Sequence, residues 1–525
     1  MEENKSFLDK NTLLAIALAI LIWVGWDYYM AQKYGPTRGA PVPQTAPANP
    51  AADLPEATPG KEVPVAVESK VIVTKEEKLI DVKNENMTFS ISTKGMGLKN
   101  IILTHFKDRE QEPIQFYNGI DISSFETTLA DGQPMFFDIE KVTDNTYVGT
   151  YKGDNVSIKK IYEVHPDTYS ITAKIEVNSQ KEQTPTINNY LVDLSGPKAE
   201  TSIFKPSYER QELFVNANNS EERHIYNAGE PLNKDYEQVA VVSLNSHYFA
   251  TGLIDKSAVI PSLKTYQKTP KGSVQPVSYA ELTYSPVKQT SIELSYIAYL
   301  GPKKMSIVSE IDSRFTNVVN FGMFSIIAKP ILKLLQFFYE LFKNYGLAII
   351  LLTILVRLLV LPFNVMSYKS MKGMQKIQPL LTELRAKYKD NPTKLNTEMM
   401  AIFKEHKVNP MGGCLPMLLQ LPIFLALYQV LGQSIELYQS PFFLWIKDLS
   451  LKDPFYVLPV LMGITMFAQQ KLTPTTMDPA QQKVMAIMPI VFTAMMVALP
   501  SGLTLYIFVS TLFAVIQQKI LMSKS

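Results

Sequence analysis

The stretch YGLAIILLTILVRLLVLPF, residues 345–363, decides the fold of this chain. It is almost unbroken hydrocarbon and long enough to cross a bilayer as one helix. Arg357 stands inside it, and placing that charge in a membrane helix costs roughly 2.5–3.5 kcal/mol on insertion scales. No Asp or Glu lies within the later apolar segments to pair with it. We therefore expect Arg357 to face a wet cavity inside the membrane.

A second interpretation of Arg357 stays open. The residue lies six positions before Phe363, which is about 9 Å along a helix. A long cationic side chain can extend over that distance to the lipid headgroups. In that case Arg357 would be an interfacial anchor and would have no role in binding.

Composition excludes several classes of protein. The 525-residue chain has a formal net charge of +2, which does not suit a nucleic-acid-binding protein with a basic stripe. Cys414 is the single cysteine, and all five histidines lie outside the apolar segments. The sequence contains no phosphate-binding GxxxxGK[ST] loop, HExxH or CxxC. We expect no catalytic site, no metal and no cofactor.

The amino-terminal part predicts an anchor and a spacer. Residues 12–30 are apolar and end in tryptophans and tyrosines, which favour a membrane interface. We expect residues 1–30 to form an uncleaved transmembrane anchor, with a cleaved signal peptide as the alternative. Residues 31–68 contain eight prolines between Pro36 and Pro64, so they are expected to be an extended linker.

Residues 70–317 are expected to form a large β-sandwich domain. Runs such as MTFSIS (87–92), YSITAKIEV (169–177) and VAVVSLNSHYFATGLI (239–254) suggest short strands punctuated by turns. The last part, 303–317, has a helical pattern and leads toward the membrane. We find no catalytic constellation in this region and expect a structural or partner-binding domain.

Residues 320–343 have lysines that interrupt an apolar surface, which indicates an amphipathic helix at the membrane interface; a spanning helix is the alternative. After the second transmembrane segment (344–363), residues 364–413 hold nine basic residues and four acids up to Lys407. They are expected to form a helical hairpin, with a kink at Pro379, Asn391 as helix cap and Pro392 at the first helical position. The positive charge makes this hairpin cytoplasmic.

Four further apolar segments complete the bundle. They occupy residues 415–431, 455–470, 484–499 and 503–520, within the range 414–521. The expected fold is thus a polytopic α-helical membrane protein with six transmembrane helices. Counting crossings from the basic hairpin places the β-sandwich outside and both termini in the cytoplasm.

Three quoted stretches carry a family resemblance. KVNPMGGCLPMLLQLPIFLALYQVL (407–431), FFLWIKDLSLKDPFYVLPVLMGITMFAQQKLTPTTMDPAQQKVM (442–485) and LPSGLTLYIFVSTL (499–512) resemble the YidC/Oxa/Alb family of membrane protein insertases. The anchor, linker and β-domain resemble the family's Gram-negative bacterial branch. The resemblance implies a five-helix insertase core, a β-supersandwich in the periplasm and a location in the bacterial inner membrane.

The resemblance also implies a function and a site. It predicts an insertase and chaperone that acts on nascent membrane proteins in contact with lipids, alone or with the Sec translocon and the ribosome, through a positively charged hydrophilic groove. The predicted groove residues are Arg357, Thr353, Gln469 and Tyr506. The predicted capture residues of the hairpin are Met371, Met374, Met399 and Phe403. In the family, substrates contact the third and fifth spans.

Two departures from the family pattern limit what carries over. The chain ends in LMSKS (521–525), where relatives often have a long basic tail that helps ribosome binding. Ile507 stands where many relatives have a second aromatic residue. Two other functions stay open: a secondary transporter for a small anion bound by Arg357, and a membrane anchor for a sugar- or lipid-binding β-domain.

Overall fold

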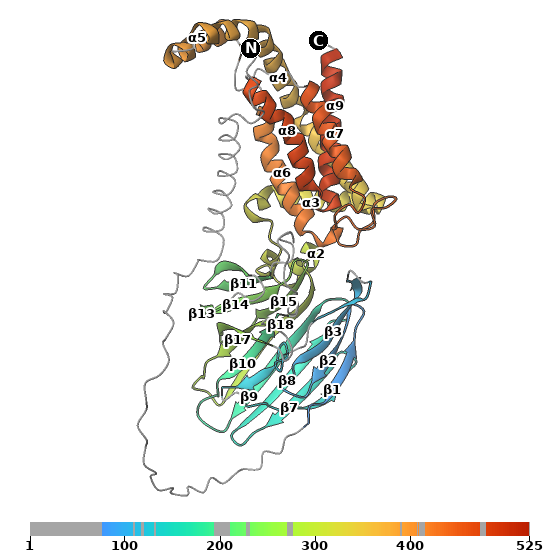
Figure 1. The fold of residues 1–525 in the computed structure, drawn as a ribbon. Helices are drawn as coiled ribbons and strands as arrows, with labels where there is room; N and C mark the ends of the chain where they lie inside the picture. Colours follow the sequence, from blue (N-terminus) through green and yellow to red (C-terminus); the bar gives the residue numbers. More distant parts are fainter. Residues whose placement is uncertain are drawn as a thin grey trace, which may run out of the picture.

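The computed structural model describes most of the chain from residue 76 onward. The described residues are 76–108, 111–116, 120–130, 133–193, 211–226, 232–269, 277–388, 391–406, 408, 415–472 and 479–523. The expected anchor (1–30), the linker (31–68) and Cys414 lie outside them. Within them, a β-domain joins a helical bundle (Figure 1).

The described strands of the β-domain form three sheets, and every neighbouring pair is antiparallel. The four-stranded sheet has the order β1 (Leu79–Lys83), β2 (Met87–Ser92), β3 (Leu98–Lys107) and β4 (Pro113–Gln115). The five-stranded sheet has the order β13 (Asp235–Tyr236), β16 (Ser262–Lys268), β17 (Val277–Tyr284), β10 (Ile187–Val192) and β5 (Thr127–Leu129). The nine-stranded sheet has the order β12 (Ser220–Tyr226), β11 (Gln211–Ala217), β14 (Val239–Asn245), β15 (Phe249–Asp255), β18 (Ser291–Pro302), β9 (Ser170–Ser179), β8 (Val156–Val164), β7 (Thr146–Lys152) and β6 (Asp138–Lys141).

Alternating side chains explain these strands. In β9 the core-facing positions include Ile171, Ala173 and Ile175, which are fully buried, as a half-buried strand requires. The run 239–254, quoted above as one stretch of strand pattern, forms two strands. It is a hairpin of β14 and β15, because the chain turns after Asn245 and the Ser246 amide donates to the Phe249 carbonyl at 2.9 Å.

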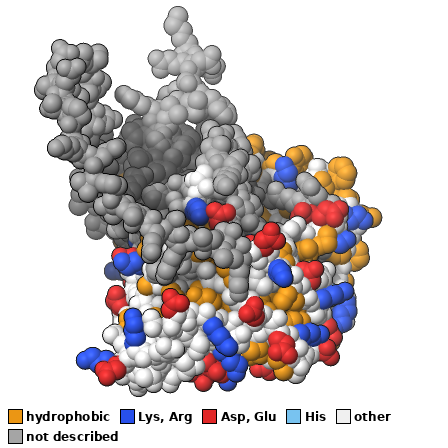
Figure 2. Space-filling view, turned by 90° about the horizontal axis from the view of Figure 1, so that it is seen from below, with side chains coloured by type: hydrophobic (Ala, Val, Ile, Leu, Met, Phe, Trp, Pro, Cys, Tyr) orange, Lys and Arg blue, Asp and Glu red, His pale blue; other side chains and the backbone are white. Residues whose placement is uncertain are grey.

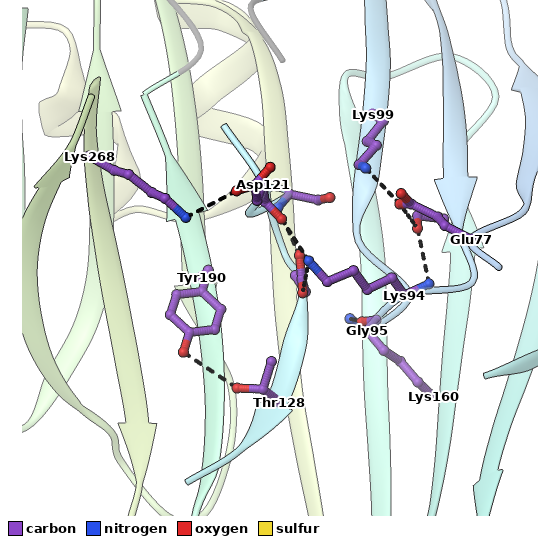
Figure 3. Close-up of polar contacts among 12 residues, drawn as sticks. Glu77, Lys94, Gly95, Lys99, Asp121, Thr128, Lys160, Tyr190 and Lys268 are labelled. Carbon is purple, nitrogen blue, oxygen red and sulfur yellow. Dashed lines mark hydrogen bonds and ion pairs between the residues drawn. The ribbon is translucent and has the colours of Figure 1, made fainter. Parts of the chain in front are cut away.

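A buried lysine ties the sheets together. Lys160 of β8 is fully buried, and its Nζ donates to the carbonyls of Gly95, Met96 and Phe125 and to the Thr127 hydroxyl, at 2.6 to 3.2 Å (Figure 3). Burial lowers the pKa of Lys160 well below its ordinary value. Four oxygen acceptors around one amine fix the loop before β5 against the β2–β3 turn.

Asp121 links the five-stranded sheet to the turn between β2 and β3 through charged side chains, and a further ion pair lies on the side of the four-stranded sheet. Lys268 pairs with Asp121 at 3.5 Å, Lys94 donates to the Asp121 carbonyl at 2.7 Å, and Lys99 pairs with Glu77 at 2.6 Å (Figure 3). Where the end of the β-domain away from the bundle is visible, charges of both signs are interspersed (Figure 2). Such a surface carries no single-sign field.

A short strap joins the β-domain to the bundle. We expected one helix over 303–317; instead α2 (Met305–Ile311) ends and a 3-10 helix, η2 (Phe315–Val318), follows. Asp312 separates the two, because its carboxylate accepts from the Arg314 amide and side chain and pairs with Lys256. These cations hold the pKa of Asp312 well below its usual range. Phe315 fills the space above Gly252, where a Cβ would lie 2.7 Å from its ring.

The bundle is built from long apolar helices. They are α3 (Ser325–Phe342), α4 (Tyr345–Lys387), α6 (Leu415–Gln433), α7 (Val457–Leu472), α8 (Pro479–Met496) and α9 (Ser501–Ser523), with the short turns η3 (Gly322–Phe324) and η5 (Ile435–Leu437). Among the described residues, Gly322–Phe342, α4 and α9 have the length and hydropathy of membrane spans. Helix α4 extends beyond Phe363, where the predicted span ends, and reaches Lys387. Pro362 and Pro379 both lie inside this helix.

Helix α3 lies at the end of the bundle that faces the β-domain (Figure 1). One of its faces is buried by Ala328, Leu332 and Leu335, while Ile326 and Leu341 are exposed. This two-sided pattern is that of an amphipathic helix. The segment also meets the length and hydropathy of a span, so the surface position stays our prediction.

The β-domain is joined to the bundle by specific contacts. In the β14–β15 turn, His247 Nε2 lies 2.7 Å from the Gly432 carbonyl at the end of α6. The hydroxyl of Tyr438 donates to the Lys107 carbonyl at 2.6 Å, and Gln439 Nε2 donates to the same oxygen at 2.9 Å. The loop between α6 and α7 therefore connects directly to the end of β3.

The hairpin projects from the other end of the bundle (Figure 1). The Asn391 side chain accepts from the Lys394 amide and Pro392 stands in the first turn, which confirms the predicted start of α5 (Pro392–Glu405). Val408 lies against Gly373, where a Cβ would lie 3.2 Å from its Cγ2. The chain turns between the end of α4 at Lys387 and the start of α5 at Pro392, and Val408, just after α5, lies back beside Gly373 of α4. Helix α5 therefore runs antiparallel to this part of α4.

Candidate functional site

Arg357 is held by a serine and has no acidic partner among the described residues. Its Nε and Nη2 both donate to the Ser510 hydroxyl of α9, at 2.9 and 2.6 Å. No carboxylate of the described chain lies within ion-pair distance of the guanidinium. The side chain is half-buried. A guanidinium has five N–H donors, so Ser510 leaves three of them for other acceptors.

Helices α4 and α9 pack side by side in the same direction. Arg357 bonds Ser510, and seven residues further along each helix Asn364 Nδ2 lies 3.5 Å from Gln517 Oε1. Toward the other end, a Cβ on Gly502 would lie 3.5 Å from Ile349 Cδ1. The sequence separation is the same for all three pairs, so the two helices stay in register. Two polar contacts, Arg357–Ser510 and Asn364–Gln517, join the helices about two turns apart.

Tyr506 extends this polar cluster to a third helix. It lies one turn before Ser510 on α9 and is 2% exposed. Its hydroxyl accepts from Gln420 Nε2 of α6 at 3.1 Å. Arg357, Ser510, Tyr506 and Gln420 thus form one polar group between α4, α6 and α9, within otherwise apolar helices.

The other two predicted groove residues, Thr353 and Gln469, are not members of the polar cluster described above. Thr353 is 1% exposed, and its hydroxyl donates to the Ile349 carbonyl of its own helix at 2.6 Å. It therefore presents little surface to a bound chain. Gln469 is half-buried on α7. Helix α7 is joined to α9 by the Thr465–Thr511 hydroxyl pair at 2.8 Å.

The start of α9 is fixed by the loop before α7. The amides of Ser501 and Gly502 donate to the carbonyls of Leu451 and Leu449, at 2.7 and 2.9 Å. Asp453 is buried in the same loop, and its carboxylate accepts from the Leu458 amide at 2.8 Å in the first turn of α7. The bonds to the start of α9 fix the position of this helix along its axis, and so decide that Tyr506 and Ser510 lie level with Arg357.

Three of the four predicted capture residues, Met374, Met399 and Phe403, lie in or beside the core of the hairpin. Met374 is buried with Ile377 and Leu381, and Met399 and Phe403 of α5 pack on them. Met371 is half-buried. Within the described hairpin, the large apolar side chains most open to solvent are others: Met366, Leu380 and Met400.

Sequence reasoning missed Ser510, Gln420, Asn364 and Gln517. A signal was present, because Tyr506, Ser510 and Gln517 recur at helical spacing inside an apolar segment. What the sequence does not contain is the register between α4 and α9, which decides that Ser510 meets Arg357.

The comparisons with known proteins agree with this architecture. Residues 79–334 match the family described as YidC periplasmic domain, and residues 337–525 match the family described as 60Kd inner membrane protein. A membrane protein insertase YidC of Geobacter sp. (strain M21) is 35% identical, over 83% of this chain and 84% of its own. The insertase YidC of Geobacter metallireducens is 31% identical, over 97% and 98%.

A solved structure is also similar. It is an active YidC insertase with its first transmembrane domain resolved, 19% identical, with a TM-score of 0.37 over 84% of this chain and 92% of its own. The sequence matches to the relatives extend through both the β-domain and the bundle. The chain therefore belongs to the YidC family of membrane protein insertases.

Proposed function

We propose that the polar cluster around Arg357 receives the hydrophilic segment of a membrane protein while the adjoining apolar segment passes into lipid. One observation carries this proposal: a half-buried arginine inside an apolar helix is held by Ser510 and has no carboxylate partner in the described chain. A charge that is expensive to place in a membrane is retained where it has a task.

Arg357 suits an acidic or polar substrate segment. Its guanidinium keeps N–H donors beyond the two used by Ser510. In a medium of lower dielectric constant than water, the attraction between this cation and a substrate carboxylate is stronger. Gln420 and Tyr506 add neutral donors and acceptors beside it. The cluster thus lowers the free energy of a polar segment partway across the membrane.

The apolar part of the substrate leaves along the outer surface of the bundle. Helix α8 exposes Met488, Ile490 and Val491, which suits contact with either lipid or a passing apolar helix. Burial of apolar surface supplies about 25 cal/mol per Å². The membrane potential adds roughly 2.3 kcal/mol per charge per 100 mV. No nucleotide or metal is needed for this drive.

The hairpin makes the first contact with the nascent chain. It carries an excess of basic residues and an apolar surface on α4 and α5. We retain Met371, Met374, Met399 and Phe403 as capture residues that act when the hairpin opens. In the closed hairpin, Leu380 and Met400 are the exposed apolar side chains.

The match of residues 79–334 to a periplasmic-domain family supports an orientation with the β-domain in the periplasm. With the β-domain in the periplasm, the hairpin and the end of α9 lie at the opposite, cytoplasmic end of the bundle (Figure 1). Both termini are then cytoplasmic if residues 12–30 cross the membrane once. There the hairpin can meet the ribosome, and the bundle can act alone or beside the Sec translocon. The protein also shields partly folded substrates, which is the chaperone role.

The anion-transporter alternative has no support, because the relatives named above are insertases. The test of the proposal is reconstitution of the purified full chain into liposomes. A small single-span protein with a short polar tail should insert much faster than into empty liposomes, as measured by protease protection of the tail. Equal rates in the two preparations would contradict the proposed function.

A further inference from the structure

A cavity lined by both amide and apolar side chains lies where the β-domain meets the bundle. Its volume is about 170 Å³. It is formed by the β14–β15 turn, the start of η3, the end of α6 and the start of α9. The lining residues are His247, Asn320, Gly322, Tyr428, Gln429, Gly432, Gln433, Pro500 and Leu503. With the β-domain in the periplasm, this is the periplasmic end of the bundle.

The lining mixes apolar and polar side chains. Asn320, Gln429 and Gln433 contribute amides, His247 is the one titratable side chain of the basic and acidic types, and no Lys, Arg, Asp or Glu of the described chain lines the cavity. Gln429 Oε1 is buried and has no hydrogen-bond partner among the described residues. A buried acceptor without a donor is unfavourable until a donor arrives. The N–H groups of a polypeptide supply such donors at every residue except proline.

A thin apolar layer separates this cavity from the Arg357 cluster. Leu427 of α6 and Leu503 of α9 are 1% and 2% exposed. Along α6, Leu427 stands between Gln420, which bonds Tyr506, and Gln429, and along α9 the cavity-lining Leu503 stands one turn before Tyr506. Gln420 and Gln429 are about 13 Å apart along α6, and Leu503 and Tyr506 about 4.5 Å apart along α9. Both distances are well below the roughly 30 Å of a bilayer's hydrocarbon core.

We propose that this cavity is the periplasmic receiving site for the translocated polar segment of an inserting protein, and that Gln429 and Gln433 bind its peptide groups. The inference rests on the proposed function and extends it. A polar segment held at Arg357 then crosses only the Leu427–Leu503 layer before it meets hydrogen-bond partners again.

The lining chemistry favours a polypeptide over a lipid headgroup. A phosphate would find no Lys or Arg among the described lining residues. Amide side chains pair with peptide groups whatever the sequence, which suits a protein that handles many substrates. Because no Lys, Arg, Asp or Glu among the described residues lines the site, acidic and basic segments can both leave through it.

The test is disulfide crosslinking in liposomes with the full chain. Cys414 is replaced by serine, and a single cysteine is introduced by Gln433→Cys or, as the matched control, Leu444→Cys. Leu444 lies in the loop between α6 and α7, is highly exposed and does not line the cavity. The substrate is a single-span protein with one cysteine in its polar translocated segment. Insertion is followed separately by protease protection.

We expect a transient adduct with Gln433→Cys that appears before protection is complete, and little adduct with Leu444→Cys. Insertion with no Gln433→Cys adduct, or with equal adducts at both positions, would overturn the receiving site and leave the insertase function intact. Failure of the wild-type chain to insert the substrate would overturn both proposals.

A second measurement avoids cysteines. Gln429→Leu should slow translocation of a long polar segment about fivefold, the effect of losing one hydrogen bond. Gln429→Asn should restore part of the rate. A substrate with a very short polar tail should be less affected by either change. An unchanged rate for the long segment in Gln429→Leu would contradict the role of this amide.

Discussion

The guanidinium of Arg357 and the hydroxyl of Ser510 are joined by two hydrogen bonds, from Nε at 2.9 Å and from Nη2 at 2.6 Å. The serine fixes the direction of the cation without neutralising it. A carboxylate in its place would form a closed ion pair and weaken the attraction for a substrate. The pair therefore explains how an arginine inside the bundle can be both ordered and available.

Charge at residue 357 should decide how acidic substrates insert. Arg357→Lys should keep much of the activity, because lysine keeps the charge although it loses the planar fork. Arg357→Ala should slow substrates with acidic tails and spare neutral ones, and Arg357→Glu should be worst. The measurement is insertion of one substrate carrying zero, one or two acidic tail residues. Equal losses across the three tails would favour the interfacial-anchor interpretation.

Ser510 should act through Arg357. Ser510→Ala removes the acceptor of both hydrogen bonds, and the loss of hydrogen bonds to a charged group costs about 1.5–3 kcal/mol each. We expect slower insertion of acidic-tailed substrates with the fold retained. Ser510→Thr keeps a hydroxyl and is the matched control. In an Arg357→Ala background, Ser510→Ala should have no further effect, and an additive loss would show that Ser510 acts independently.

The proposed orientation can be tested by labelling. Val142 in the β-domain and Met400 in the hairpin are both exposed. In a Cys414→Ser background, Val142→Cys should react with an impermeant thiol reagent when only the outer membrane is permeable. Met400→Cys should react only after the inner membrane is opened. Reversed labelling would invert the topology.

The hairpin core should matter for capture more than for bundle stability. Phe403→Gly removes an apolar side chain that packs on the Met374 cluster and lowers helix propensity by up to about 1 kcal/mol. We expect less crosslinking of nascent chains to the hairpin and unchanged thermal stability of the bundle. Met400→Gly lowers the propensity of the same helix at an exposed position and is the control. Equal loss of capture in both variants would mean that helix content alone matters.

Asp255 should make the β-domain less stable as pH rises. Burial raises the pKa of this carboxyl to about 6, although Tyr284 and Ser257 donate hydrogen bonds to it. A raised pKa means that the folded state favours the protonated form. The contribution of Asp255 to the free energy of unfolding is therefore fully present below about pH 4. As pH rises through 6 the free energy of unfolding falls by about 3 kcal/mol.

The measurement for Asp255 is denaturant unfolding of the full chain in detergent, followed by protease susceptibility of the β-domain between pH 4 and 7. Asp255→Asn should flatten this dependence relative to the wild type. Asp312 is a contrast, because its lowered pKa gives stability that is lost only below about pH 4. A parallel decline in wild type and Asp255→Asn would assign the pH dependence to other carboxyls.

The sequence alone determined the elements with strong local signals. Period-two alternation gave β2 at Met87–Ser92, and the Asn391–Pro392 pair gave the start of α5. Continuous hydrocarbon marked α4 and singled out Arg357 as the costly residue. Where a local pattern admitted two outcomes, the structure decided between them. One apolar run became the β14–β15 hairpin, and the segment before α3 became α2 and η2 because Asp312 separates them.

Tertiary structure decided which residues meet. Arg357 bonds Ser510 only because α4 and α9 pack in parallel with a fixed register, which the Leu449 and Leu451 carbonyls set by holding the start of α9. The same packing buries Thr353 and creates the amide-lined cavity between domains distant in sequence. Local sequence specifies where a helix can form, through hydrophobic burial and backbone preference. The partner of a side chain depends on long-range packing, which the periodicity of one segment does not encode.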